Sequence, residues 1–140
     1  MPTDERDDLG GGGETILASA RRNIAIHGYS ITYVFGDEVD VPFCYSVGLW
    51  ETWSHPELLL YGLSWDDTAT VMGALSRQIR DGRRFADGEI DEEMFDRKIA
   101  FVNVAPGRYE GRIPVTIMYY EGFDFPLLQV ITPDEGGRFP

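Results

Sequence analysis

The chain has 140 residues, of which 43% are hydrophobic and 13% aromatic, and its formal net charge is −12. This composition is typical of a globular protein. The negative charge repels phosphate backbones and anionic lipids, so we expect no nucleic acid and no membrane partner. No apolar run approaches the roughly 20 residues that cross a bilayer. Because the first residues, MPTDERDDLGGGG, lack the basic start and apolar stretch of a signal peptide, we expect a cytoplasmic location.

The first half of the chain predicts a tail, a helix and a hairpin. Residues 1–13 are mostly polar or glycine and predict a disordered tail. Within residues 14–27 the apolar side chains recur at helical spacing, and Gly28 can end that helix by taking a positive φ. Residues 29–35 and 42–49 predict two strands of a hairpin, joined by a turn longer than the tight two-residue kind.

The segment from Pro42 to Leu63 is the most informative part of the chain, because two apolar runs flank a loop rich in aromatic and polar residues. We call residues 50–57 the tryptophan loop; it carries Trp50, Trp53, His55, Pro56 and Glu57. Each flanking run contains a glycine, Gly48 or Gly62, which costs a strand entropy and packing. The two glycines therefore predict a close backbone approach or a bulge.

The segment after the tryptophan loop predicts a strand and a helix. Residues 57–63 form an apolar run that predicts a buried strand. Ser64 can cap a helix that stops near Gly82, and the acidic residues after the serine suit the positive end of the helix dipole. The stretch 87–96 holds six acidic residues and predicts a solvated loop or a short helix. A few of its side chains are expected to turn inward: Ile90, Met94 and Phe95.

The last part of the chain completes an α+β pattern. Residues 99–104 and 127–132 predict strands, whereas 113–121 predicts either a short helix or an edge strand, because Pro114 suits both. Hairpin-like strands with few helices between them favour an α+β fold. We predict a mainly antiparallel sheet with two or three helices packed on one of its faces. The expected organisation is a single domain, 14–140, behind the disordered tail.

Several short motifs resemble a known bacterial family. They are His27-Gly28, Tyr45-Ser46-Val47-Gly48-Leu49, His55-Pro56-Glu57-Leu58, Gly62-Leu63, and the closing Pro133-Asp134 with Gly137, Phe139 and Pro140. Together they resemble domain of unknown function family 4262 over about residues 15–140. This family brings no established activity, so the resemblance implies one compact domain and adds little about function. Many of its members continue past the final proline.

His55 and Glu57 lie two residues apart, so on a strand their side chains would point to the same face. They could then act as an acid/base pair, or bind a metal together with His27 or Asp134. The alternative is that His55 caps a turn and Glu57 is solvated. Because the sequence has no ligand motif such as HExxH, we predict no metal site and no cofactor.

Cys44 is the only cysteine, which excludes an internal disulfide and a thiolate zinc cluster. A reactive thiolate needs an electropositive neighbourhood, which His27 or His55 could supply. The aromatic residues on either side of the cysteine favour instead a small buried hydrophobic residue. Ser46 lies outside any nucleophile-elbow motif, and we expect it to face outward from its strand.

Aromatic residues gather in two parts of the chain, the tryptophan loop and residues 119–125. If the two groups meet, they could line a pocket for a flat or apolar ligand. The candidate ligand-binding residues are Tyr45, Trp50, Trp53 and Tyr119. The alternative is that these side chains form core packing and a surface for self-association.

Four arginines lie at or just beyond the end of the helix that follows Ser64: Arg77, Arg80, Arg83 and Arg84. Such a group could bind an anion such as phosphate. It could equally pair with the acidic stretch 87–96 and with the negative end of the helix dipole. We favour the pairing.

Two functions from different classes fit these residues. The one we favour is a non-enzymatic binding module, whose aromatic-lined pocket holds a small molecule or a partner peptide. The other is a small hydrolase-like enzyme that uses His55 and Glu57 as acid and base, with Cys44 or His27 assisting. The sequence alone leaves open whether the chain is an enzyme. Aromatic loops and sheet edges also favour a homodimer.

Overall fold

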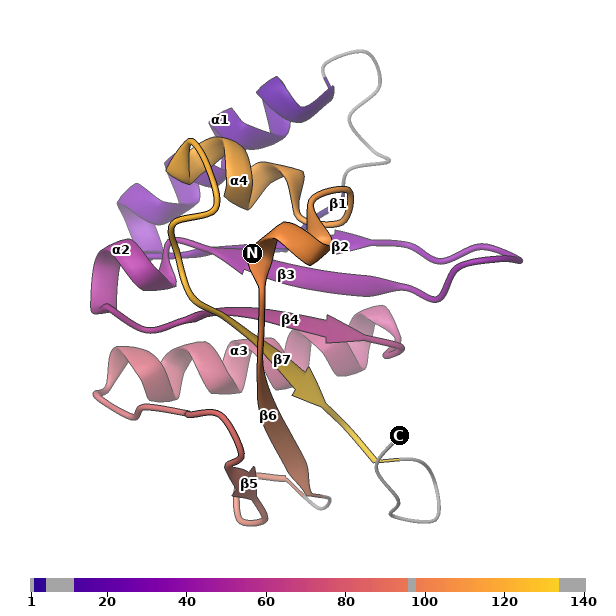
Figure 1. Cartoon of the computed structure of the whole chain (residues 1–140), viewed down its shortest axis with the longest axis vertical. Coiled ribbons are helices and arrows are strands. Elements are labelled where there is room, and N and C mark those ends of the chain that lie inside the picture. Colours follow the sequence, from indigo (N-terminus) through magenta and orange to yellow (C-terminus); the bar gives the residue numbers. More distant parts are fainter. Residues whose placement is uncertain (1, 5–11, 96–97, 134–140) are drawn as a thin grey trace.

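The computed structural model describes residues 2–4, 12–95 and 98–133 as a sheet with helices on both faces (Figure 1). In chain order the elements are β1 (Pro2–Asp4), α1 (Gly12–His27), β2 (Ser30–Val34), β3 (Phe43–Val47), α2 (Leu49–Trp53), β4 (Glu57–Tyr61), α3 (Trp65–Arg80), β5 (Ile90–Asp91), β6 (Ile99–Val104), the 3-10 helix η2 (Pro106–Tyr109), α4 (Pro114–Tyr120) and β7 (Leu127–Ile131). Among these residues, no helix is both long enough and apolar enough to cross a membrane.

The strands of the described residues form one sheet in the order β1-β2-β3-β4-β7-β6-β5. The pairs β1–β2 and β4–β7 are parallel, and the other neighbouring pairs are antiparallel. The predicted hairpin is present, with Ser30 opposite Val47 and Val34 opposite Phe43. The α+β fold class and the mainly antiparallel sheet are therefore confirmed.

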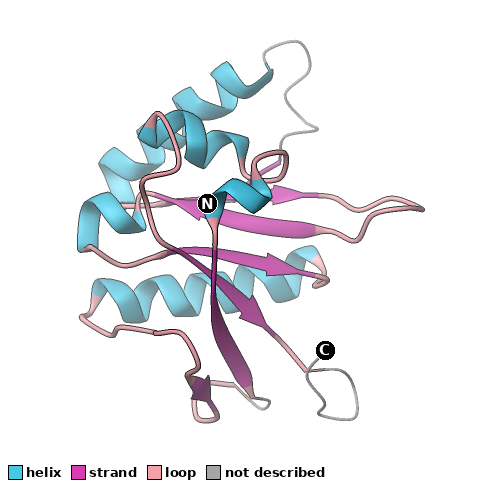
Figure 2. Cartoon of the chain, in the orientation of Figure 1, coloured by secondary structure: helices cyan, strands magenta, loops and turns pink. Residues whose placement is uncertain are grey.

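The sheet carries a hydrophobic core on each face. Along β3, Cys44 points into a cluster with α3, which we call the α3-side core, while Phe43 and Tyr45 point into a cluster with α1 and α4, the α1-side core. Figure 2 shows α1 and α4 side by side and α3 apart from them. The prediction of helices on one face is wrong, because β3 is buried at every position and both its faces need cover.

The two long helices begin and end near the predicted residues. Ser64 Oγ accepts a hydrogen bond from the Asp67 backbone N–H at 3.2 Å, which confirms the cap of α3. Gly28 follows the end of α1 with φ 90°, as predicted. Part of the predicted tail has secondary structure, since residues 2–4 pair with β2 and α1 begins at Gly12. The rest of that tail, apart from Gly13 in α1, lies outside the described residues.

Two helices occupy segments where the sequence predicted a loop or left the choice open. The tryptophan loop contains most of α2. The residue just before this helix, Gly48, has a left-handed backbone conformation with φ 104°. A Cβ atom on Gly48 would lie 2.8 Å from Ile24 Cγ1, so the predicted close approach is present there. Gly62 also has a positive φ, but open space surrounds it. Residues 113–121 contain α4, with Pro114 at its first position.

The described part of the acidic stretch, residues 87–95, contains the short strand β5 between turns and bends. Met94 and Phe95 pack against the α3-side core, as predicted, whereas Ile90 is 52% exposed. Ile90 starts β5, which lies at the edge of the sheet.

Candidate functional site

The side chain of Glu57 forms the centre of a buried hydrogen-bond network beneath the tryptophan loop. It is fully buried at the first position of β4. Four donors from β3 and the start of α2 reach its carboxylate: Ser46 Oγ at 2.7 Å, and the backbone N–H groups of Gly48 at 2.9 Å, Leu49 at 3.3 Å and Trp50 at 3.1 Å. The Tyr120 hydroxyl of α4 donates a fifth hydrogen bond.

This network saturates the Glu57 carboxylate, which has about four lone-pair sites in all. The backbone donors are the N–H groups at the start of α2, which have no partner within the helix and carry partial positive charge. Burial raises the pKa of Glu57, and the hydrogen bonds from Ser46, Tyr120 and the backbone oppose that rise. The carboxylate thus ties β3, β4, α2 and α4 together, with no open side for a substrate.

Ser46 is part of the same network, although the sequence predicted an outward-facing residue. It is 1% exposed, so that prediction is wrong. Its hydroxyl donates to Glu57 and accepts the Leu58 backbone N–H at 2.8 Å, while Thr116 Oγ1 donates to its carbonyl oxygen at 2.8 Å. The signal for this role was a polar residue inside an otherwise apolar strand, FCYSV, beside a strand that opens on glutamate.

His55 belongs to the tryptophan loop and is fully buried, with its ring against the segment after α3. Its Nδ1 lies 2.8 Å from the Pro56 carbonyl oxygen, and its Nε2 accepts the Phe85 backbone N–H at 3.0 Å. This pair of contacts requires a neutral ring with its proton on Nδ1. Burial lowers the pKa of His55, which favours the same neutral form. Both ring nitrogens therefore hold backbone groups together.

The remaining catalytic candidates lie in different surroundings. Cys44 is fully buried in the α3-side core, and burial raises the pKa of its thiol well above the ordinary range. His27 is exposed on the last turn of α1. Over residues 2–4, 12–95 and 98–133, no three His, Cys, Asp or Glu side chains gather closely enough to hold a metal ion.

The candidate ligand-binding aromatics are divided between core and surface. Tyr45 is fully buried in the α1-side core, and Trp53 packs against Tyr29 with ring centroids 6.3 Å apart. Trp50 is 38% exposed. Tyr119 donates from its hydroxyl to Glu51 Oε1 at 2.7 Å. The tryptophan loop and α4 thus meet, as the pocket hypothesis requires, and hydrogen bonds from Tyr119 and Tyr120 join them.

Most of the arginines after Ser64 have partners within the chain. Arg83 pairs with Glu89 at 2.6 Å and Asp91 at 3.2 Å, which confirms the predicted pairing with the acidic stretch. Arg84 donates to the Trp53 carbonyl oxygen at 2.6 Å. The Arg84 contact joins the segment after α3 to the tryptophan loop, and the Arg83 contacts join it to the acidic stretch.

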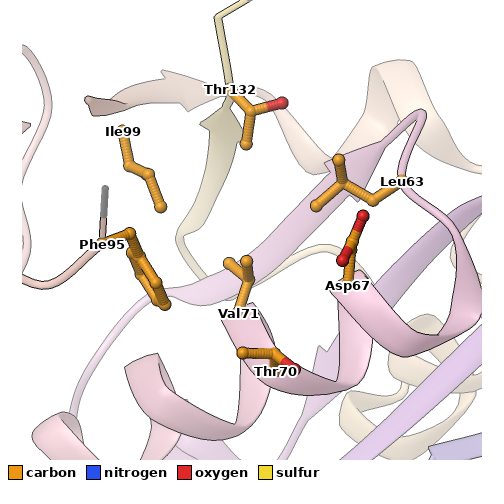
Figure 3. A pocket seen from close by; sticks show the side chains of 7 residues that line it. All are labelled: Leu63, Asp67, Thr70, Val71, Phe95, Ile99 and Thr132. Atoms are coloured by element: carbon orange, nitrogen blue, oxygen red, sulfur yellow. The ribbon is translucent and has the colours of Figure 1, made fainter. Parts of the chain in front are cut away.

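A pocket of about 190 Å³ lies on the face of the sheet that α3 covers. We call it the α3–β6 pocket; it is lined by Leu63, Asp67, Thr70, Val71, Phe95, Ile99 and Thr132. Figure 3 shows the apolar side chains pointing toward one another around the hollow, with the Asp67 carboxylate beside Leu63. Four of its seven lining residues are apolar and three are polar, a mixture that small-molecule sites also show.

None of the candidate ligand-binding aromatics, Tyr45, Trp50, Trp53 and Tyr119, lines the α3–β6 pocket. Its lining comes from the residues just after β4 and β7, the first half of α3, the start of β6 and the acidic stretch. The sequence indicated Asp67 only as a favourable charge at a helix start, and Phe95 only as an inward-facing side chain. Because the lining residues lie far apart along the chain, no local sequence pattern predicts that they form one pocket.

Comparison with models of known protein families identifies the family of this chain. The family model described as "Domain of unknown function (DUF4262)" matches residues 23–140. The chain therefore belongs to this family, as the resemblance of its motifs predicted. A search of curated proteins found no match, and a search of solved structures found none either.

Proposed function

We propose that this chain is a binding module whose small-molecule ligand occupies the α3–β6 pocket. The single observation that carries the proposal is a hollow of about 190 Å³ with apolar walls and an open carboxylate at its rim. This volume is below the roughly 300–1,000 Å³ of drug-sized sites, so a compact ligand fits best.

The polar groups of the pocket indicate the chemistry of the ligand. Within the described residues, the Asp67 carboxylate makes no hydrogen bond or ion pair; only its backbone N–H is bound, to Ser64. The Thr70 hydroxyl donates to the Asp66 carbonyl oxygen at 3.0 Å, so its lone pairs remain for a ligand. Both groups therefore present acceptors, which suit a ligand that carries a donor, above all a protonated amine.

The walls of the pocket suit the other end of such a ligand. Val71 and Ile99 belong to the α3-side core, and Leu63 and Phe95 pack against it, so their positions are set by the fold. A branched aliphatic or small aromatic body would remove this apolar surface from water. The proposed ligand is thus a compact amine with an apolar body.

The enzyme alternative has less support in this geometry. His55 and Glu57 would both have to exchange their backbone partners before they could meet a substrate. A buried thiol with a raised pKa is a poor nucleophile, which weakens an assisting role for Cys44. The homodimer and the cytoplasmic location stay predictions from the sequence.

The test compares two probes of the same shape and opposite charge, isopentylamine and isovalerate, by isothermal titration calorimetry. We expect saturable binding of the amine and none of the carboxylate. Asp67→Asn should weaken amine binding about tenfold, because it removes a charge-assisted hydrogen bond. The matched control is Asp66→Asn, which removes the same charge one residue away and outside the pocket lining. Equal loss in both variants, or equal binding of both probes, would contradict the proposal.

A further inference from the structure

A second hollow of about 320 Å³ lies between the end of α1 and the second half of α3. Its lining residues are Ile26, His27, Tyr29, Ser76, Arg77 and Arg80. Three of these six side chains carry nitrogen donors with basic character, although the chain as a whole has a net charge of −12. A locally basic hollow on an acidic protein is a feature that the amine-binding proposal leaves unexplained.

Ser76 supplies an independent observation at the same place. This serine is fully buried, and its Oγ has no hydrogen-bond partner among the described residues. A buried hydroxyl without a partner costs free energy, and native proteins rarely keep one without a bound water, ion or ligand. Thr32 Oγ1 is also buried without a partner, but Thr32 does not line this hollow. Ser76 therefore offers a hydrogen-bond donor on the wall of a hollow that two arginine side chains also line.

The two arginines of the hollow are available to a ligand. Arg77 makes no ion pair with any residue in the described ranges, and its side chain is exposed. Arg80 bonds Asp81 Oδ1 through Nε at 3.2 Å, but these side chains are 53% and 66% exposed, so water competes with the pair. The terminal nitrogens of Arg80 remain free to donate, because that bond uses only Nε.

From this arrangement we infer that the hollow between α1 and α3 binds a phosphate monoester. Two guanidinium groups, one imidazole and one hydroxyl provide donors from two helices. A phosphate has more acceptor oxygens than a carboxylate, and its charge of nearly −2 matches two arginines. Ile26 and Tyr29 add an apolar wall for the organic part of the ligand. This site is separate from the α3–β6 pocket, so either proposal can fail without the other.

The test uses the two histidines of the chain as reporters, one in the hollow and one outside it. Inorganic phosphate is titrated at constant pH and ionic strength, with chloride as the balancing salt, and the imidazole proton signals are followed by NMR. We expect the His27 signals to shift along a saturating curve. The His55 signals should stay in place, since that ring is buried and bonded to backbone groups. No shift of His27, or a shift that grows without saturation, would overturn the inference.

Two pairs of variants separate a built site from general charge attraction. Arg77→Gln should weaken phosphate binding at least about tenfold, because hydrogen bonds to charged groups are the strong ones. Arg108→Gln removes the same charge from an exposed position in η2 outside the hollow, and it should leave the affinity unchanged. Ser76→Ala should weaken binding by about two- to tenfold, whereas Thr32→Val should not. Equal effects within either pair would overturn the inference.

Discussion

Glu57 and Asp67 are both carboxylates close to the start of a helix, yet the fold uses them in opposite ways. Glu57 is fully buried and accepts five hydrogen bonds from β3, α2 and α4. Asp67 is exposed, and its carboxylate has no partner within the described residues. A carboxylate whose acceptor sites are all occupied holds the fold together, whereas an unpaired carboxylate at the rim of a hollow can bind a ligand. The tryptophan loop is thus the closed region and the α3–β6 pocket the open one.

The largest effect should come from removing the charge of the closed region. Glu57→Gln replaces an acceptor by an amide that also donates, so several buried N–H and O–H groups lose their partner. We expect a loss of about 3–5 kcal/mol in the free energy of unfolding, measured with urea. Glu51→Gln is the control: Glu51 is exposed, and among the described residues its carboxylate accepts a hydrogen bond from the Tyr119 hydroxyl alone, so the loss should stay below about 1 kcal/mol. Equal losses would mean that the network does not organise the loop.

The next largest loss of stability should come from crowding the tightly packed start of α2 in the closed region. Gly48→Ala should destabilise by about 2–4 kcal/mol, because a positive φ is strained for alanine and the new Cβ would crowd Ile24. Gly62→Ala meets the same φ penalty without a neighbour, so about 1 kcal/mol is expected from thermal or urea unfolding. If the two variants unfolded alike, the approach of α1 to Gly48 would not matter.

A smaller effect should appear in the pH dependence of stability. The pKa of His55 is lowered in the folded chain, so below about pH 6.5 the unfolded chain binds a proton that the folded chain does not. Stability should therefore fall as the pH drops below that value. The raised pKa of Glu57 acts in the opposite direction, so the informative quantity is the difference between the native chain and His55→Gln. A difference that did not change with pH would contradict the neutral, backbone-bound ring.

The smallest effect should be found in the open region. Asp67→Asn should change the free energy of unfolding by less than about 1 kcal/mol, since only the interaction with the α3 dipole is lost. The measurement is again urea unfolding, beside Asp66→Asn at the neighbouring position. A loss comparable to that of Glu57→Gln would make Asp67 a structural residue and would remove the contrast between the two regions.

Much of the fold followed from local patterns. The apolar runs gave the strands of the central sheet, and Ser64 with its acidic neighbours gave the start of α3. The tail and the tryptophan loop were harder, because β1 and α2 are short and depend on partners elsewhere in the chain. α2 starts where Gly48 turns the chain and Glu57 receives its free N–H groups, and such a tertiary contact leaves no periodic signal.

The sites followed from the sequence only in part. The pattern placed His55 and Glu57 near each other along the chain, but could not show that backbone groups occupy both. It grouped four arginines and predicted their pairing, which holds for Arg83 and leaves Arg77 without an ion pair among the described residues. The α3–β6 pocket joins residues from Leu63 to Thr132, and only the folding of the sheet brings them together.

The proposed ligand site can be tested directly by a map of backbone amide shifts by NMR during a titration with isopentylamine. We predict that saturating shifts gather around the α3–β6 pocket, at Leu63, Val71 and Ile99. The amides of Gly48 and Trp50, held by Glu57, should stay in place. Shifts that gathered at the tryptophan loop and left the pocket unchanged would contradict it, because the closed region would then be the one that binds.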